Sequence, residues 1–122
     1  MPSIINDITT VLSALKGFRA DMNNEKNTQQ QLHQVLTAKG FDFVREYYLD
    51  KNNIPDLFNA AAGIAIEVKI KGQKSAIFKQ LLRYSRFEQV KILVLCSNKS
   101  LGLPTLINGK PAYYIHLGKA YL

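Results

Sequence analysis

The chain has 122 residues, of which 47% are hydrophobic and 20% are charged. This length suits a single domain, and the composition is ordinary for a globular protein. No apolar run approaches the ~20 residues that a membrane-spanning helix needs, and no secretory signal pattern is visible. The single cysteine, Cys96, lies in an apolar run and is predicted to pack as a small hydrophobe. We therefore expect a cytoplasmic protein with no membrane partner.

The formal net charge is +7, from 16 Lys and Arg against 9 Asp and Glu. Such an excess on a small domain favours a polyanionic partner, and DNA is the one that we expect. Many basic domains bind no polyanion, so the net charge alone does not establish this partner.

Apolar residues at helical spacing predict two helices at the start of the chain, over residues 3–17 and 24–39. Asn23 or Asn24 is suited to cap the second helix, and Gly40 is suited to end it. The hydrophobic period then changes to one that is typical of strands.

Three strands are predicted over residues 41–49, 54–58 and 63–71, separated by the turn cluster "DKNN" and by "NAAAG". Because these strands follow one another through short connections, we expect them to form a meander.

A third helix is predicted over residues 75–87, with Ser75 as a suitable cap. The nearly continuous apolar run over 90–97 indicates a strand buried on both faces. The segments "GLP" and "NGKP" are typical of loops, and a last strand is predicted over 112–117. The order α-α-β-β-β-α-β-β predicts one α/β domain with a mixed central sheet.

Charged residues alternate with apolar ones along the strand predicted over 63–71. Side chains two residues apart on a strand share a face and lie roughly 7 Å apart, so Glu67 and Lys69 are neighbours. Asp56, at the end of the preceding predicted strand, approaches Glu67 if the two strands pair as a hairpin. Two carboxylates so close repel each other unless a cation lies between them. Mg²⁺ prefers such oxygen ligands, and an adjacent lysine can stabilise developing charge, so these groups suit phosphodiester hydrolysis.

The alternative for the same residues is the solvent-exposed face of a sheet, where alternating charges are normal. If the motif were accidental in a basic structural protein, Glu67 and Lys69 would lie far from Asp56. A separation of the Asp56 and Glu67 carboxylates well beyond about 8 Å would exclude a shared ion.

The segments "IPD", "EVK" and "KQLLRY" together resemble the PD-(D/E)-x-K nuclease superfamily, which has the restriction-endonuclease-like fold. The motif positions are residues 55–56 and 67–69. The predicted elements over 24–97 match the αβββαβ core of that family. An N-terminal helix extension over 1–20 and a C-terminal strand over 110–122 flank this core.

The resemblance implies roles for the motif residues. Asp56, Glu67 and the backbone carbonyl of Val68 would bind Mg²⁺, with Mn²⁺ as a substitute, and Lys69 would support the attacking water.

Three further residues resemble site residues of this superfamily. Gln80 and Tyr84, at i and i+4 on one helix face, resemble the Q-x-x-x-Y motif of RecB-type members, whose side chains hold substrate near the metal. Glu25 resembles the acid of the first core helix, which assists metal or water binding. Each also has a structural explanation: Gln80 and Tyr84 as helix surface and core edge, and Glu25 as an acid favoured by the helix dipole.

Five basic residues lie on or beside the strand and helix that carry these motifs. They are candidates for phosphate contacts that give affinity without sequence reading, or they belong to a solvated helix face. They are Lys71, Lys74, Lys79, Arg83 and Arg86.

The resemblance implies a Mg²⁺-dependent nuclease that hydrolyses DNA phosphodiester bonds by attack of an activated water. No separate sequence-reading domain is present, so we expect a structure-selective endonuclease, or one whose specificity comes from a protein partner. The chain is similar in size to archaeal Holliday-junction resolvases, which work as homodimers. The sequence does not decide whether the substrate is DNA or RNA, or whether the enzyme is an endonuclease or an exonuclease. The alternative function is a non-catalytic nucleic-acid-binding or assembly module, against which the intact Asp56, Glu67 and Lys69 argue.

Overall fold

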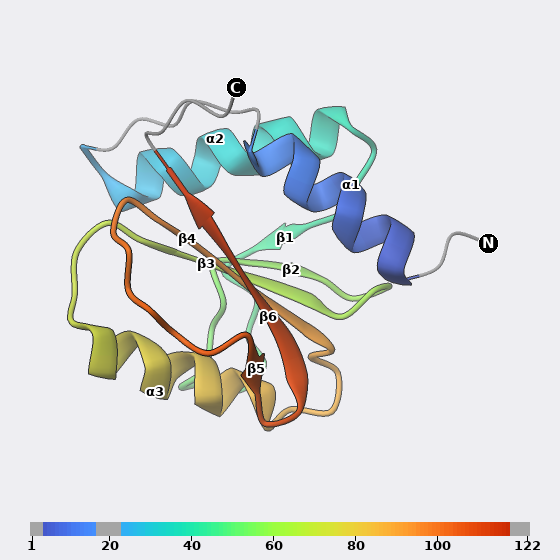
Figure 1. The fold of residues 1–122 in the computed structure, drawn as a ribbon. Helices are drawn as coiled ribbons and strands as arrows, with labels where there is room; N and C mark the ends of the chain where they lie inside the picture. Colours follow the sequence, from blue (N-terminus) through green and yellow to red (C-terminus); the bar gives the residue numbers. More distant parts are fainter. Residues whose placement is uncertain (1–3, 17–22, 118–122) are drawn as a thin grey trace.

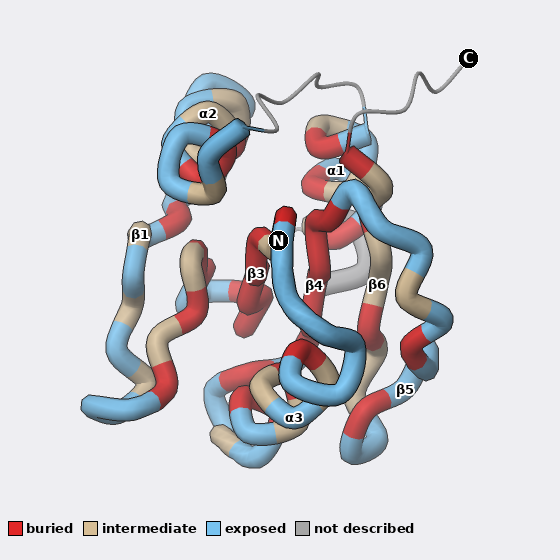
Figure 2. The backbone as a smooth tube through the Cα atoms, turned by 90° about the vertical axis from the view of Figure 1, so that its left-hand side faces the viewer, coloured by how far each residue is buried: buried red, intermediate tan, exposed pale blue. Residues whose placement is uncertain are grey.

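The computed structural model describes residues 4–16 and 23–117. These residues form three layers, with helices on both faces of one mixed sheet (Figures 1 and 2). Helices α1 (Ile4–Lys16) and α2 (Glu25–Ala38) cover one face, and α3 (Lys74–Ser85) covers the other. The predicted α/β architecture with a mixed sheet is confirmed. In the described part of the chain, no helix is long and apolar enough to cross a membrane.

The sheet has six strands in the order β1-β2-β3-β4-β6-β5. Strands β3, β4 and β6 are parallel, whereas β1, β2 and β5 each pair antiparallel with their neighbours. The strand bounds are β1 (Val44–Arg45), β2 (Leu57–Asn59), β3 (Ile64–Lys69), β4 (Ile92–Ser97), β5 (Leu106–Ile107) and β6 (Lys110–His116).

Two apolar clusters hold the layers together. Leu32 and Leu36 of α2 pack with the side of the sheet that carries Ile66, while Leu81 of α3 packs with the side that carries Leu93. Fully burying one such side chain stabilises the fold by about 1.5–3 kcal/mol. Every residue of β4 is buried, as its continuous apolar run indicated. Cys96 is among them, which confirms the prediction that it packs in the core.

The start and end of α2 agree with the prediction. The side chain of Asn24 caps the helix by accepting from the backbone N–H of Asn27 over 3.1 Å. Gly40, just beyond the end, has a φ of +90°, which glycine adopts without strain. The prediction that Ser75 caps α3 is wrong, because α3 begins at Lys74 and Gln73 stands at the cap without a side-chain bond.

The strand predicted over 41–49 is wrong for most of its length, since only Val44 and Arg45 are paired. Glu46 has a φ of +50°, a left-handed conformation that ends an extended strand. Beyond it, the Tyr47 ring packs against Phe58 with the ring centroids 4.7 Å apart.

The second and third predicted strands are shorter than expected. Strand β2 begins at Leu57, so Asp56 precedes the strand that it was predicted to close. Pro55 has no backbone N–H to donate to a ladder, which favours a later start. Strand β3 ends at Lys69, and Lys71 lies beyond it.

The segment "NGKP" (108–111), predicted as a loop, contains the turn of the β5–β6 hairpin, and β5 lies between it and "GLP" (102–104). Asn108 and Gly109 have φ values of +53° and +75°, as a two-residue hairpin turn requires. The last strand therefore starts at Lys110 and is longer than the predicted 112–117. Residues 1–3 and 17–20 of the predicted N-terminal helix extension and residues 118–122 of the predicted C-terminal strand lie outside the described residues.

Candidate metal and phosphodiester site

Asp56 and Glu67 lie together because β2 pairs with β3, with Leu57 opposite Ile66. The backbone N–H of Asp56 donates to Oε1 of Glu67 over 3.3 Å. The backbone N–H of Val68 donates in turn to Oδ2 of Asp56 over 2.7 Å. Each carboxylate is thus bonded to the main chain of the neighbouring segment. The separation that an accidental motif would show is not found.

The Glu67 carboxylate is buried, with 3% of the residue exposed. The interpretation of this face as an ordinary solvent face is therefore wrong for Glu67. Burial, and then the negative charge of Asp56, raise the pKa of Glu67 to about 8. Burial likewise raises the pKa of Asp56. Both shifts favour the protonated form of the pair in the absence of a cation.

Lys69 lies on the open side of this pair. Its Nζ is 3.3 Å from Oε2 of Glu67, and 24% of its side chain is exposed. Lys69 therefore pairs with the buried carboxylate while part of its side chain stays exposed to solvent. Its positive charge opposes the rise in the pKa of Glu67.

Gln80 and Tyr84 of α3 form a chain of hydrogen bonds to the same carboxylate. The Tyr84 hydroxyl donates to Oε1 of Glu67 over 3.1 Å and accepts from Nε2 of Gln80 over 2.8 Å. Burial raises the pKa of Tyr84, so the hydroxyl remains a neutral donor. Tyr84 is only 1% exposed, so its ring is covered and its hydroxyl is held against Glu67.

Glu25, at the start of α2, reaches the end of β3. Its Oε1 accepts from the backbone N–H groups of Ile70 and Lys71, over 2.8 and 3.2 Å. Its charge also contributes to raising the pKa of Asp56. Within residues 4–16 and 23–117, no three His, Cys, Asp or Glu side chains form a metal-ligand group. The role of Glu25 as a metal ligand stays a prediction.

Gln29 belongs to the site and was missed by the sequence reasoning. It is 2% exposed, and its Oε1 accepts from Nε and Nη2 of Arg45 over 3.0 and 2.8 Å. Its side chain also hydrogen-bonds to Asp56 and lowers the pKa of that acid. A polar residue four positions after Glu25 and seven before Leu36 stands on the inward face of the helix. That register was the signal that could have found it.

The five basic residues predicted to contact phosphates are all exposed. The backbone of Lys71 is bonded to Glu25, so this residue adjoins the site. Lys79 and Arg83 are exposed on α3, and Arg86 stands at its C-terminal cap. Arg83 donates from Nε to Oδ1 of Asn53 over 3.1 Å. The structure thus brings Glu25, Asp56, Glu67, Lys69, Gln80 and Tyr84 together, and of the five basic residues Lys71 adjoins them.

The donor set fits a hard divalent cation. It offers the carboxylate oxygens of Asp56 and Glu67. A bound cation would offset the repulsion between these two groups. The N–H and C=O of one strand residue point toward the same neighbour. Because the N–H of Val68 bonds to Asp56, its carbonyl also points to that side.

In comparisons with protein-family models, curated proteins and solved structures, the chain has no significant match.

Proposed function

We propose that this chain is a divalent-metal-dependent nuclease of the PD-(D/E)-x-K type, with the restriction-endonuclease-like fold, that hydrolyses DNA phosphodiester bonds. The observation that carries the proposal is the close Asp56–Glu67 pair, in which Glu67 is buried and Asp56 is half-buried, with Lys69 beside it. Burying two neighbouring carboxylates destabilises a fold unless a cation or proton compensates them. An arrangement that costs stability in this way is typical of a functional site.

The roles of the residues follow from their contacts. Asp56, Glu67 and the Val68 carbonyl would hold Mg²⁺ or Mn²⁺. When bound, that cation polarises a phosphate oxygen and lowers the pKa of a water molecule. Lys69 places a positive charge where the phosphate gains negative charge in the transition state. Gln80 and Tyr84 hold Glu67 in position.

The remaining surface supports a polyanionic substrate. The exposed basic residues and the net charge of +7 would give salt-dependent affinity for the phosphate backbone. We further propose a cytoplasmic, structure-selective endonuclease, working as a homodimer or with a protein partner that supplies specificity.

The experiment that tests this function compares cleavage of a labelled substrate panel by the wild type and by Lys69→Ala. The panel contains linear duplex, single strand, flap, four-way junction and RNA, each with Mg²⁺ and with EDTA. We expect Mg²⁺-dependent cleavage that falls about 100-fold or more in Lys69→Ala, as for loss of a charge that acts in the transition state. Lys91→Ala, an exposed lysine at the amino end of β4, is the matched control and should cut like the wild type.

Equal cutting by the wild type and Lys69→Ala would refute the assigned role of this lysine. Salt-sensitive binding by both proteins without any cutting would replace the nuclease with the non-catalytic binding module.

A further inference from the structure

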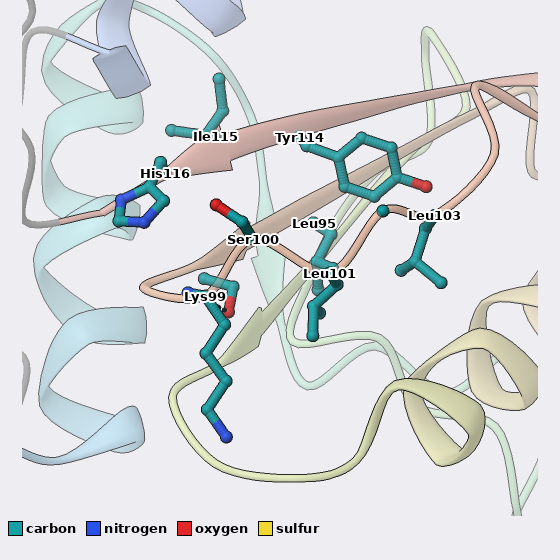
Figure 3. Close-up of a pocket in the computed structure, with 10 residues that line it drawn as sticks. Leu95, Lys99, Ser100, Leu101, Leu103, Tyr114, Ile115 and His116 are labelled. Carbon is teal, nitrogen blue, oxygen red and sulfur yellow. Dashed lines mark hydrogen bonds between the residues drawn. The ribbon is translucent and has the colours of Figure 1, made fainter.

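A cavity of about 230 Å³ opens at the carboxyl ends of β4 and β6, under the loop over 98–104 (Figure 3). It is separate from the carboxylate pair, and none of the roles assigned above uses it. Its lining combines polar and apolar side chains.

The strand register places this cavity beside the carboxylate site. Lys69 of β3 is the register partner of Ser97, which in turn is the partner of His116. Two residues earlier along each strand, Glu67 is the register partner of Leu95, and Leu95 is the register partner of the cavity residue Tyr114. Register partners on parallel strands share a face, and neighbouring strands lie about 4.8 Å apart. The cavity therefore begins one strand from Lys69 and reaches about 10 Å from it.

The polar lining residue nearest to the carboxylate site is Ser97, the register partner of Lys69. Oγ of the buried Ser97 accepts from the backbone N–H of Lys99 over 3.2 Å and retains its own hydrogen for donation. The side chain of Lys99 extends toward the loop that follows β3, where its Nζ lies 3.4 Å from the carbonyl oxygen of Gly72 (Figure 3). A second ammonium, that of Lys74, lies 3.7 Å from where a Cβ on Gly102 would stand. Lys99 therefore lines the cavity, and Lys74 lies beside its lining residue Gly102.

The apolar side is formed by Leu95, Leu101, Leu103 and the ring of Tyr114 (Figure 3). The Tyr114 hydroxyl donates to the carbonyl oxygen of Pro104 over 2.7 Å, which ties the loop to β6 and fixes the ring. Flat apolar and aromatic surfaces of this kind accept a nucleobase without selecting its identity.

We propose that this cavity binds one unpaired nucleotide of the strand whose phosphate lies at the Asp56–Glu67 pair. The base lies against Leu101 and Tyr114, and its phosphate lies toward Ser97 and Lys99. The inference rests on the proposed function, because it takes that strand as the substrate of the neighbouring site. The cavity is smaller than the ~300–1,000 Å³ of drug-sized ligand sites, so it accommodates a single base rather than a base pair. The substrate class is therefore a strand with an unpaired nucleotide next to the cleaved bond, as in a flap or a frayed end.

The test measures binding in EDTA, where no cleavage occurs, by fluorescence anisotropy. The probes are two labelled DNAs of equal length, one fully paired and one with a single-stranded flap. We expect the wild type to prefer the flap, and we expect Leu101→Ser and Lys99→Ala each to weaken flap binding about tenfold while leaving duplex binding unchanged. Lys91→Ala, which removes the same charge at the opposite, amino end of β4, should change neither affinity.

Two outcomes would overturn the proposal. One is an equal loss on both probes in Lys99→Ala and Lys91→Ala, which would indicate diffuse attraction to phosphates. The other is unchanged flap binding in Lys99→Ala, an exposed position whose replacement leaves the core intact. A thermal melt of Leu101→Ser establishes that this half-buried variant is folded.

Cleavage with Mg²⁺, measured in parallel, separates this proposal from the proposed function. If the cavity variants lose flap binding selectively but no protein cleaves, the nucleotide-binding cavity is supported and the nuclease function is rejected. Cleavage with no selective loss would uphold the nuclease and reject the cavity.

Discussion

The backbone N–H of Asp56 donates to Oε1 of Glu67 over 3.3 Å, so the main chain of one acid holds the side chain of the other. The Asp56 side chain is held in turn by the N–H of Val68. Both acids are therefore fixed before any ion binds, and their repulsion is built into the fold. Such preorganisation has measurable consequences for stability.

Glu67 makes the stability of the metal-free protein depend on pH. Its folded-state pKa is about 8, above the ordinary value of 4.5, so the folded state keeps a proton that the unfolded chain has lost. The free energy of unfolding should therefore fall as the pH rises from about 4.5 to about 8. Urea unfolding in EDTA at pH 5 and pH 8.5 should show a shallower fall in Glu67→Gln than in the wild type. An equally steep fall in both proteins would contradict the raised pKa of Glu67. Glu88→Gln, which changes an exposed acid, is the control.

A divalent cation should stabilise the wild type by relieving this repulsion. Mg²⁺ or Mn²⁺ at 100 times its dissociation constant adds about 2.7 kcal/mol to the free energy of unfolding. We expect the melting temperature at pH 8 to rise by several degrees when either ion is added. The rise should be much smaller in Asp56→Asn. Asp42→Asn changes an exposed acid and should keep the full shift. Equal shifts in the two variants would mean that the ions bind elsewhere.

Tyr84→Phe removes one hydroxyl that serves two partners, Glu67 and Gln80. Leaving buried polar groups without a partner costs about 1–3 kcal/mol of stability, measurable by urea unfolding. The Tyr84 bond also lowers the pKa of Glu67, so its loss should weaken cation binding and raise the Mg²⁺ concentration needed for half-maximal cleavage. Tyr48→Phe removes the same atom from an exposed ring and should be neutral on both measures. Matching values for the two variants would show that the Tyr84 hydroxyl does not position the acid.

Gly63 joins β2 to β3 in a conformation that excludes a side chain. Its φ is +69°, and an added Cβ would stand 2.5 Å from Cγ of Lys91 and 2.7 Å from the backbone oxygen of Gln89. Gly63→Ala should therefore cost about 1–2 kcal/mol for the left-handed conformation and a further 1–3 kcal/mol for the clash. Gly109→Ala has a φ of +75° but meets nothing within 4 Å, so it should cost only the first amount. Urea unfolding measures both, and equal losses would mean that Lys91 and Gln89 move aside.

The central part of the fold was predictable because its signals are local. The continuous apolar run of β4 follows directly from burial on both faces. Strand β3 is also buried on both faces, and its apolar positions were enough to predict a strand although Glu67 and Lys69 interrupt them. The end of β1 was not predictable, because the left-handed φ of Glu46 accompanies a tertiary contact, a hydrogen bond from its N–H to the carbonyl oxygen of Asp56. The β5–β6 hairpin had a local signal, Asn108-Gly109, that was assigned to a loop instead.

The same distinction applies to the site. Alternation along one strand correctly placed Glu67 and Lys69 on a shared face. Burial of Glu67 could not be predicted in this way, because the packing of α3 over that face decides it. The bonds of Gln29 to Arg45 and Asp56 join three distant segments, and in the sequence only its inward helical register points to them.

The connection over residues 60–63 also bears on the order of folding. Closing this short loop pairs β2 with β3, whereas pairing β3 with β4 requires the chain from 70 to 91 to cross over through α3. Local pairings carry the smaller entropic cost of loop closure, so we expect the β2–β3 hairpin to form first. Water then still separates the charges of Asp56 and Glu67. Their repulsion grows when α3 docks and excludes that water, which makes helix docking, rather than hairpin closure, the step whose rate depends on pH.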